Sequence, residues 1–165
     1  MGASDTHSTD ESAPETVRRY RRVLVLVAVA LAPWTAVSAN GFVSWFLPIG
    51  IVNLDPLELT TIFEYYLLYT RNLPPYLNAW GLSVVVFFVG LVSALVGLVW
   101  REDARVTASM FVLAGIGQLV FALGFFRRGQ GYAAVPIGTL LLWGVVWRYY
   151  RRDLASIFQF PDGTE

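Results

Sequence analysis

The sequence predicts an all-α integral membrane protein with four transmembrane helices and an extracytoplasmic interfacial amphipathic helix between the first and second of them. Three observations lead to this fold class. Of the 165 residues, 56% are hydrophobic and only 15% are charged, which is too apolar for the surface of a soluble domain of this length. Long uncharged runs recur along the chain, with arginines at their ends. One more polar stretch separates the first run from the others.

The second of the four predicted spans, 80–100, is the clearest, because it contains no charged residue. Its terminal indoles, Trp80 and Trp100, would be about 30 Å apart along a helix, which matches the thickness of the hydrocarbon core. The third span holds one strongly polar side chain, Gln118, and Pro33 should kink the first. The other spans are expected at about 23–39, 106–126 and 132–149.

Both ends of the chain are expected outside the membrane domain, which occupies 18–152. Residues 1–17 contain almost nothing apolar and are predicted to form a disordered, acidic cytoplasmic tail. Residues 153–165 are predicted to form a second cytoplasmic tail. In an alternative interpretation, residues 1–39 are a cleaved signal sequence with an arginine-rich start, an apolar segment and a cleavage site at Val37–Ala39. Three spans would then remain.

Arginine supplies all twelve basic residues and predicts the orientation. In the four-span arrangement, nine arginines fall on one side of the membrane and three on the other. Cytoplasmic loops carry the excess of basic residues, so the N- and C-termini are expected in the cytoplasm. An even number of spans also requires both termini on one side. The predicted location is therefore the cell membrane, in a multi-pass arrangement.

The interfacial helix is expected at about 56–71. Asp55 and Glu58 have the spacing of a capping box, and Pro56 suits the first position of a helix. The segment contains too many charges to cross a bilayer cheaply, and aromatic residues are concentrated around it, as they are at the level of lipid headgroups. Capping alone accounts for both acids.

Three polar residues are candidates for binding or transport: Glu64, Arg71 and Gln118. Glu64 and Arg71 are two helical turns apart, so they would form either a solvated surface pair or a charged site for a substrate or partner. Gln118 lies on a face of small residues, the kind of face that lines contacts between membrane helices. It would hydrogen-bond another helix, for example through Ser93 or Thr139, or line an ion pathway.

The sequence contains few groups that support chemistry. It has no cysteine, which excludes disulfides and thiolate ligands, and its single histidine, His7, lies in the N-terminal tail. No catalytic or nucleotide-binding motif is recognisable. We therefore expect no catalytic residue, no cofactor and no metal. The net charge of zero argues against nucleic acid as a partner. The expected partner is the lipid bilayer, with another membrane protein or further copies of the chain as open alternatives.

Five short segments are similar to those of a family of small, uncharacterised four-span membrane proteins from halophilic archaea. They are APW at 32–34, GIVN at 50–53, YTRNLPPY at 69–76, RED at 101–103 and AVPIGT at 134–139. The resemblance covers residues from about 21 to 150 and leaves both tails outside. It implies a membrane location and a lineage, and it implies no activity.

The leading functional expectation is a membrane protein without enzymatic activity that acts as an accessory or scaffold subunit. Features that favour helix packing are abundant in this sequence, while reactive groups are scarce. The first alternative is a small channel or transporter component, with Gln118 and the helix of Glu64 at its mouth. The second alternative is a membrane-surface enzyme that uses Glu58 and Glu64 as its acids.

Overall fold

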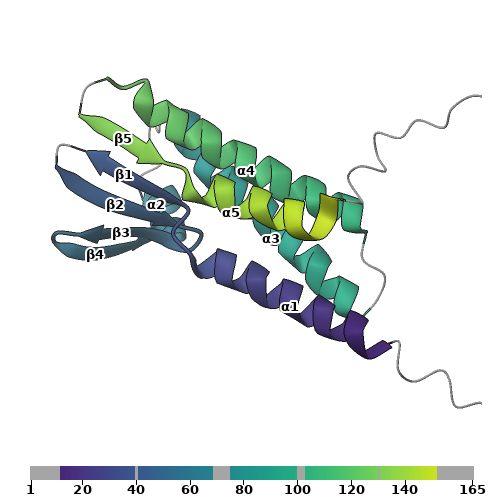
Figure 1. The fold of residues 1–165 in the computed structure, drawn as a ribbon. Coiled ribbons are helices and arrows are strands. Elements are labelled where there is room, and N and C mark those ends of the chain that lie inside the picture. Colours follow the sequence, from purple (N-terminus) through teal and green to yellow (C-terminus); the bar gives the residue numbers. More distant parts are fainter. Residues whose placement is uncertain (1–11, 40, 69–74, 100–102, 130, 152–165) are drawn as a thin grey trace, which may run out of the picture.

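The computed structural model describes residues 12–39, 41–68, 75–99, 103–129 and 131–151, and it combines a layer of helices with one antiparallel sheet (Figure 1). The helices run side by side, and the sheet lies at one end of them (Figure 1). The elements in chain order are α1 (Ser12–Leu31), β1 (Thr35–Ala39), β2 (Phe42–Leu47), β3 (Gly50–Leu54), β4 (Leu57–Thr61), α2 (Ile62–Leu68), α3 (Pro75–Val99), α4 (Ala104–Phe126), β5 (Tyr132–Val135), α5 (Ile137–Val145) and η1 (Val146–Tyr150), a π-helical turn that continues α5.

The prediction of an all-α fold with four transmembrane helices is wrong. The described residues form a five-stranded sheet, and among them only α3 and α4 are long and apolar enough to cross a membrane. These two helices coincide closely with the predicted spans 80–100 and 106–126. The predicted span 23–39 contains the end of α1 and all of β1, and the predicted span 132–149 contains β5, α5 and most of η1.

Helix α1 ends where Pro33 makes a longer helix unfavourable. The last backbone hydrogen bond of the helix runs from the Ala32 N–H to the Ala28 carbonyl. Proline disfavours helical geometry in the residue before it and cannot donate a backbone hydrogen bond. The chain therefore leaves the helix and enters β1. Both segments belong to one apolar run, within which hydrophobic pattern alone does not distinguish a short strand from a helix.

The predicted helix 56–71 is also wrong, because its first third is a strand. Asp55 and Pro56 form the turn between β3 and β4 and are joined by a cis peptide bond. Glu58 lies in β4, opposite Asn53 of β3. The β-branched pair Thr60 and Thr61 favours the extended backbone of β4. The helix α2 begins only at Ile62.

The two predicted tails fall mostly outside the described residues. Helix α1 begins at Ser12, inside the segment 1–17 that was expected to be disordered. Residues 1–11 and 152–165 are outside the described part of the chain, as is Arg71.

The sheet has the strand order β4-β3-β2-β1-β5, and every neighbouring pair is antiparallel. Strands β1 to β4 form a meander. Strand β5 follows α4 in the chain and pairs with β1 on the other side, opposite Ala36 to Ala39. One face of the sheet, which we call the inner face, packs on the helices. Its buried side chains are Thr35, Val37, Phe46, Ile51 and Ala134.

Small residues allow the helices to approach one another closely. A Cβ atom added at Gly90 of α3 would lie 2.8 Å from Cε1 of Phe111 on α4. A Cβ atom added at Gly115 of α4 would meet the indole of Trp143 on α5. Glycine at both positions therefore sets the spacing of the three helices, in agreement with the role expected for small residues between apolar helices.

Trp34 joins three elements at the corner between α1 and β1. Its indole Nε1–H donates to the Val29 carbonyl of α1 at 2.8 Å, and its backbone N–H donates to the Phe46 carbonyl of β2 at 2.8 Å. Its own carbonyl accepts from the Gly138 N–H of α5 at 2.6 Å. The side chain is fully buried. This corner therefore fixes the first helix, the sheet and the last helix relative to one another.

We expect Gly138→Ala to destabilise the protein, because the added Cβ would lie 2.9 Å from Cβ and Cγ of Trp34. Overpacking of this kind costs about 1–3 kcal/mol. The matched control is Gly144→Ala in the same helix, where an added Cβ has no atom within 4 Å. That control should be neutral or should gain up to about 1 kcal/mol from helix propensity. Thermal unfolding of the purified variants measures both, and equal midpoints would contradict the account of the corner.

Candidate functional site at the junction of helices and sheet

Five buried side chains form a layer where the sheet meets the helices, and we call them the junction layer. They are Thr35 of β1, Phe46 of β2, Trp80 of α3, and Gln118 and Phe121 of α4. The Phe46 ring lies 5.3 Å from the Trp80 ring and 4.9 Å from the Phe121 ring, measured between centroids, and both contacts are edge-to-face. Thr35 is the cross-strand neighbour of Phe46. The layer therefore combines an aromatic cluster with two polar side chains.

Gln118 is fully buried, and its partner comes from the sheet. The Thr35 hydroxyl donates to the Gln118 Oε1 atom at 3.0 Å. The expected helix partners are engaged elsewhere. The hydroxyl oxygens of Ser93 and Thr107 lie 2.8 Å apart, and the Thr139 hydroxyl donates to the Gly115 carbonyl at 2.8 Å. Sequence reasoning missed Thr35 because its position appeared to belong to a transmembrane helix.

Two N–H donors of the junction layer have no hydrogen-bond partner in the described part of the chain. They are Nε2 of Gln118 and Nε1 of Trp80, and both atoms are buried. Phe121, one helical turn after Gln118, has its ring 6.4 Å from that of Trp80, so both donors belong to the same region of the core. A site with N–H donors complements an acceptor, such as a water oxygen or an anion, and does not complement a cation.

Two tyrosines of α2 pack against the same tryptophan. The rings of Tyr65 and Tyr66 lie 5.6 Å and 6.0 Å from that of Trp80. The Tyr66 hydroxyl donates to the Leu77 carbonyl at 2.7 Å and accepts from the Gly81 N–H at 3.1 Å. Burial raises the pKa of both phenols above the usual value. These contacts hold α2 against the start of α3.

Glu64 caps α2. Its Oε2 atom accepts from the Thr61 N–H at 3.0 Å and from the Thr61 hydroxyl at 2.9 Å, and the Glu64 N–H donates to that hydroxyl at 3.2 Å. This is the reciprocal pattern of a capping box. The hydrogen bonds from the Thr61 N–H and hydroxyl lower the pKa of the Glu64 carboxyl. Glu64 is therefore engaged in local structure.

The other predicted acid, Glu58, is exposed in β4, and the geometry of the predicted Glu64–Arg71 pair lies outside the described residues. Within the described part of the chain, no group of three or more His, Cys, Asp or Glu side chains gathers as metal ligands would. Of the predicted site residues, Gln118 is the one that meets a polar side chain distant in the sequence, that of Thr35.

We expect Thr35→Val and Gln118→Leu to be strongly coupled. Thr35→Val alone leaves the buried Gln118 Oε1 atom without its hydrogen-bond donor, which costs about 1–3 kcal/mol of stability. Gln118→Leu alone likewise leaves the buried Thr35 hydroxyl without its hydrogen-bond acceptor. The double variant should lose less than the sum of the two, by about 0.5–3 kcal/mol. Denaturant unfolding of the four proteins measures this coupling, and additive losses would contradict the hydrogen bond.

The capping box predicts a pH dependence at the start of α2. Because the folded state lowers the pKa of Glu64 from its ordinary 4.5, its stabilising contribution is complete above that value. The contribution disappears as the pH falls through the lowered pKa. We expect the hydrogen-exchange protection factor of the Thr61 amide to fall over this range. Glu64→Gln should remove the pH dependence and Glu58→Gln should preserve it. An unchanged profile in Glu64→Gln would rule out this role for Glu64.

Comparison with known proteins places the chain in a family. A search of the curated proteins and a search of the solved structures each give no match. A family model described as a domain of unknown function, DUF8050, matches residues 3–159, which is nearly the whole chain. The chain therefore belongs to the DUF8050 family.

Proposed function

We propose that this protein is a multi-pass membrane protein of the cell membrane, in which α3 and α4 cross the bilayer. We further propose that it acts as an accessory or scaffold subunit without enzymatic activity. The observation that carries the proposal is an apolar belt, which we define as the exposed large apolar side chains of these two helices. They are Leu82, Val85, Phe88, Val89, Val92, Leu95, Val96 and Val99 on α3, and Val106, Leu113, Ile116, Val120, Leu123 and Phe126 on α4.

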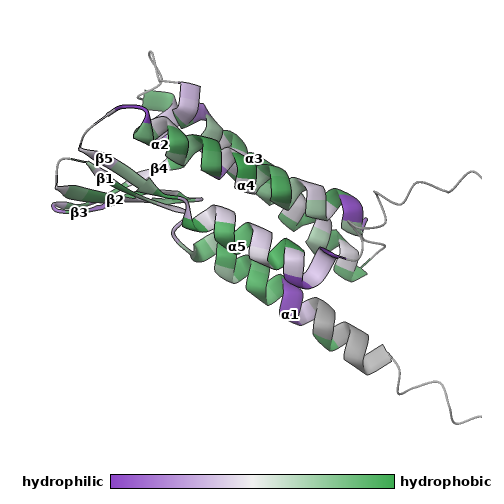
Figure 2. Cartoon of the chain, turned by 45° about the horizontal axis from the view of Figure 1, so that its top comes forward, coloured by the Kyte–Doolittle hydropathy of each residue, from purple (hydrophilic) through white to green (hydrophobic). Residues whose placement is uncertain are grey.

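The belt distinguishes these helices from the core helices of a soluble protein. A helix that is apolar all round is normally buried on all sides. In the most apolar 18-residue segments of α3 and α4, only 39% and 44% of residues are buried. Figure 2 shows hydrophobic residues along both helices. An apolar surface of this extent is rare on a soluble monomer, whereas lipid covers it without cost.

The lengths of the two helices support the same proposal. Helix α3 has 25 residues and α4 has 23, so they are about 37 Å and about 34 Å long. Both exceed the hydrocarbon thickness of about 30 Å, which leaves room for a modest tilt. Helices α1 and α5 pack beside them and also expose apolar side chains, among them Leu24, Val27 and Leu140, as does Trp147 in the turn η1 that continues α5.

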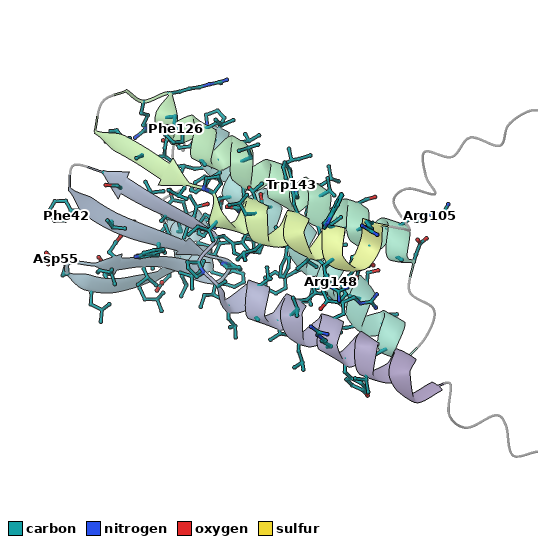
Figure 3. The ribbon with its side chains drawn as sticks, viewed as in Figure 1. Phe42, Asp55, Arg105, Phe126, Trp143 and Arg148 are labelled. Carbon is teal, nitrogen blue, oxygen red and sulfur yellow. The ribbon has the colours of Figure 1, made fainter. Side chains whose placement is uncertain are left out.

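Charge supports an orientation. Figure 3 shows Arg105 and Arg148 at the end of the helices opposite to Phe42 and Asp55 of the sheet. The N-terminal part of α1, which carries four arginines between residues 18 and 22, lies toward that same end (Figure 1). Because basic residues are enriched on the cytoplasmic side, we propose that this end and both termini are cytoplasmic. The sheet would then be extracytoplasmic.

The accessory role is supported by the use of polar side chains inside the protein. Hydroxyls of Thr35, Ser93, Thr107 and Thr139 hydrogen-bond to other elements of the bundle or sheet. They hold the fold together, which is what a scaffold requires. Extraction in a gentle detergent should recover a stoichiometric partner together with the protein. Recovery of the isolated chain alone would contradict the accessory role.

A channel or transporter component is the second candidate, and the two unpartnered donors favour it. The Nε2 atom of Gln118 and the Nε1 atom of Trp80 would face an acceptor, so the permeant species would be water or an anion. Flux of a small anion into liposomes containing the protein, lost in Gln118→Leu, would support this candidate. Equal flux in empty liposomes would exclude it.

We expect Val89→Arg to reduce membrane insertion, because Val89 lies near the middle of α3 and is 51% exposed. An arginine at the centre of a span costs about 2.5–3.5 kcal/mol on insertion scales. The control is Leu67→Arg on α2, which is 78% exposed at the end near the sheet and should insert normally. Recovery of each protein in the carbonate-washed membrane pellet measures insertion. Wild-type protein in the soluble fraction would contradict the proposal.

A further inference from the structure

The sheet has a second face, which we call the outer face, and it is apolar across all five strands. In antiparallel pairing, residues directly opposite one another point to the same side of the sheet. One row of opposed residues crosses the whole sheet: Val135, Ala36, Trp45, Val52 and Leu59. Two positions further along each strand, the same face carries Ala133, Ser38, Val43, Leu54 and Leu57. Ser38 is the single polar residue among these ten.

The outer face is separate from the core described above. None of its residues belongs to the buried cluster or to the half-buried side chains packed against that cluster. In Figure 1 no helix lies over this face of the sheet. Leu54, Leu57 and Leu59 are more than half exposed. An antiparallel sheet that packs one face on a core normally presents polar side chains on the other. This composition therefore indicates a face that another surface covers.

We propose that the outer face packs against the outer face of a second copy of the chain, in a two-fold symmetric dimer. The orientation of the two copies rests on the proposed membrane location. Lipid, another possible occupant, is less compatible with the sheet. An unrelated protein, the remaining possibility, is distinguished by the experiment below.

Lipid does not suit this face, because the sheet is open at both edges. Strands β4 and β5 each have a strand neighbour on one side only. Their outward backbone N–H and C=O groups would be without partners in hydrocarbon, where only helices and closed barrels satisfy the backbone. The edge strand β4 also carries Glu58, and the adjoining turn carries Asp55. The sheet therefore lies in water, and its apolar face needs cover from protein.

A second copy suits the face in charge and in geometry. The ten residues include no charged side chain, so two identical faces meet without repulsion. The strands run roughly along the helix axes (Figure 1). A two-fold axis along the membrane normal therefore brings the two outer faces together while both copies keep the same orientation in the bilayer. The two sheets would pack about 10 Å apart, as in a β-sandwich.

The area of the face is sufficient for partners that a membrane already confines. Five strands at about 4.8 Å spacing give a width of about 24 Å, and strands of five residues give a length of about 17 Å. The flat footprint is thus about 400 Å² per copy, or about 800 Å² over both copies, which is below the about 1,000 Å² needed between freely diffusing partners. Confinement in one membrane and in one orientation raises the effective concentration of the partner, so a small interface suffices.

Single cysteines test the dimer directly, because the chain has none. Val43→Cys on the central strand β2 and Val52→Cys on β3 place a thiol on the outer face. Leu67→Cys on α2 is the matched control, since Leu67 is exposed and its helix packs on Trp80, on the inner side of the sheet. Each full-length variant is treated in its native membranes with a short bismaleimide, and the mass of the product is measured. We expect a cross-linked product of twice the chain mass from Val43→Cys and Val52→Cys, and monomer from Leu67→Cys.

The other possible outcomes of this experiment contradict different parts of the proposal. Monomer from both outer-face variants in the membrane fraction would overturn the dimer and leave the membrane proposal standing. A product of another mass would assign the face to a different protein. Equal dimer from Leu67→Cys would show that cross-linking reports crowding and not this interface. Recovery of all variants in the soluble fraction would instead contradict the proposed function, which keeps the two failures distinguishable.

Discussion

The contact of the Phe46 ring with Trp80 and Phe121 attaches the sheet to the helices, and the rest of the structure depends on it. This contact fixes which face of the sheet is buried. With β2 in place, its neighbour β1 brings Thr35 to Gln118 and places Trp34 at the corner where α1, the sheet and α5 meet. The buried face has large apolar and aromatic side chains in the middle, so burial of that area stabilises the attachment. The outer face of the sheet remains uncovered by the helices.

The protein therefore has three apolar surfaces with different surroundings. One is the core, in which the inner face of the sheet meets α3 and α4. Another is the apolar belt, whose length matches a bilayer. The last is the outer face, whose open sheet edges are incompatible with lipid. A composition that is 56% hydrophobic follows from this division, because the chain needs apolar residues on surfaces that a soluble domain would make polar.

Sequence could predict the parts of the fold that depend on local pattern. Helices α3 and α4 contain long uncharged runs, and a face of small residues was visible around Gln118. The strands were missed because β1 and β5 lie inside apolar runs. They pair with each other although α3 and α4 separate them in the sequence, and no local pattern indicates such a contact. The capping box illustrates the same limit. Thr61 and Glu64 have its spacing as plainly as Asp55 and Glu58 do, and only the pairing of β4 with β3 decides between them.

Only part of the candidate site could be predicted, because local pattern identifies one of its residues and does not identify the contacts between distant elements. Gln118 stood out as the one strongly polar side chain in the predicted span 106–126, and its burial follows from the small residues beside it. Its partner Thr35, and the donor of Trp80 in the same layer, come from elements far apart in sequence. Trp80 was interpreted as a residue at the membrane interface, but it is fully buried among aromatic rings of the sheet and of α2.

The most direct test of the central claim is the accessibility of spin labels in liposomes containing the protein. A nitroxide at Val89→Cys, on the apolar belt, should be reached by oxygen and protected from a water-soluble nickel chelate. A nitroxide at Glu58→Cys, on the exposed edge of the sheet, should show the reverse. This result would place the helices in lipid and the sheet in water. Nickel access at Val89 equal to that at Glu58 would contradict the account.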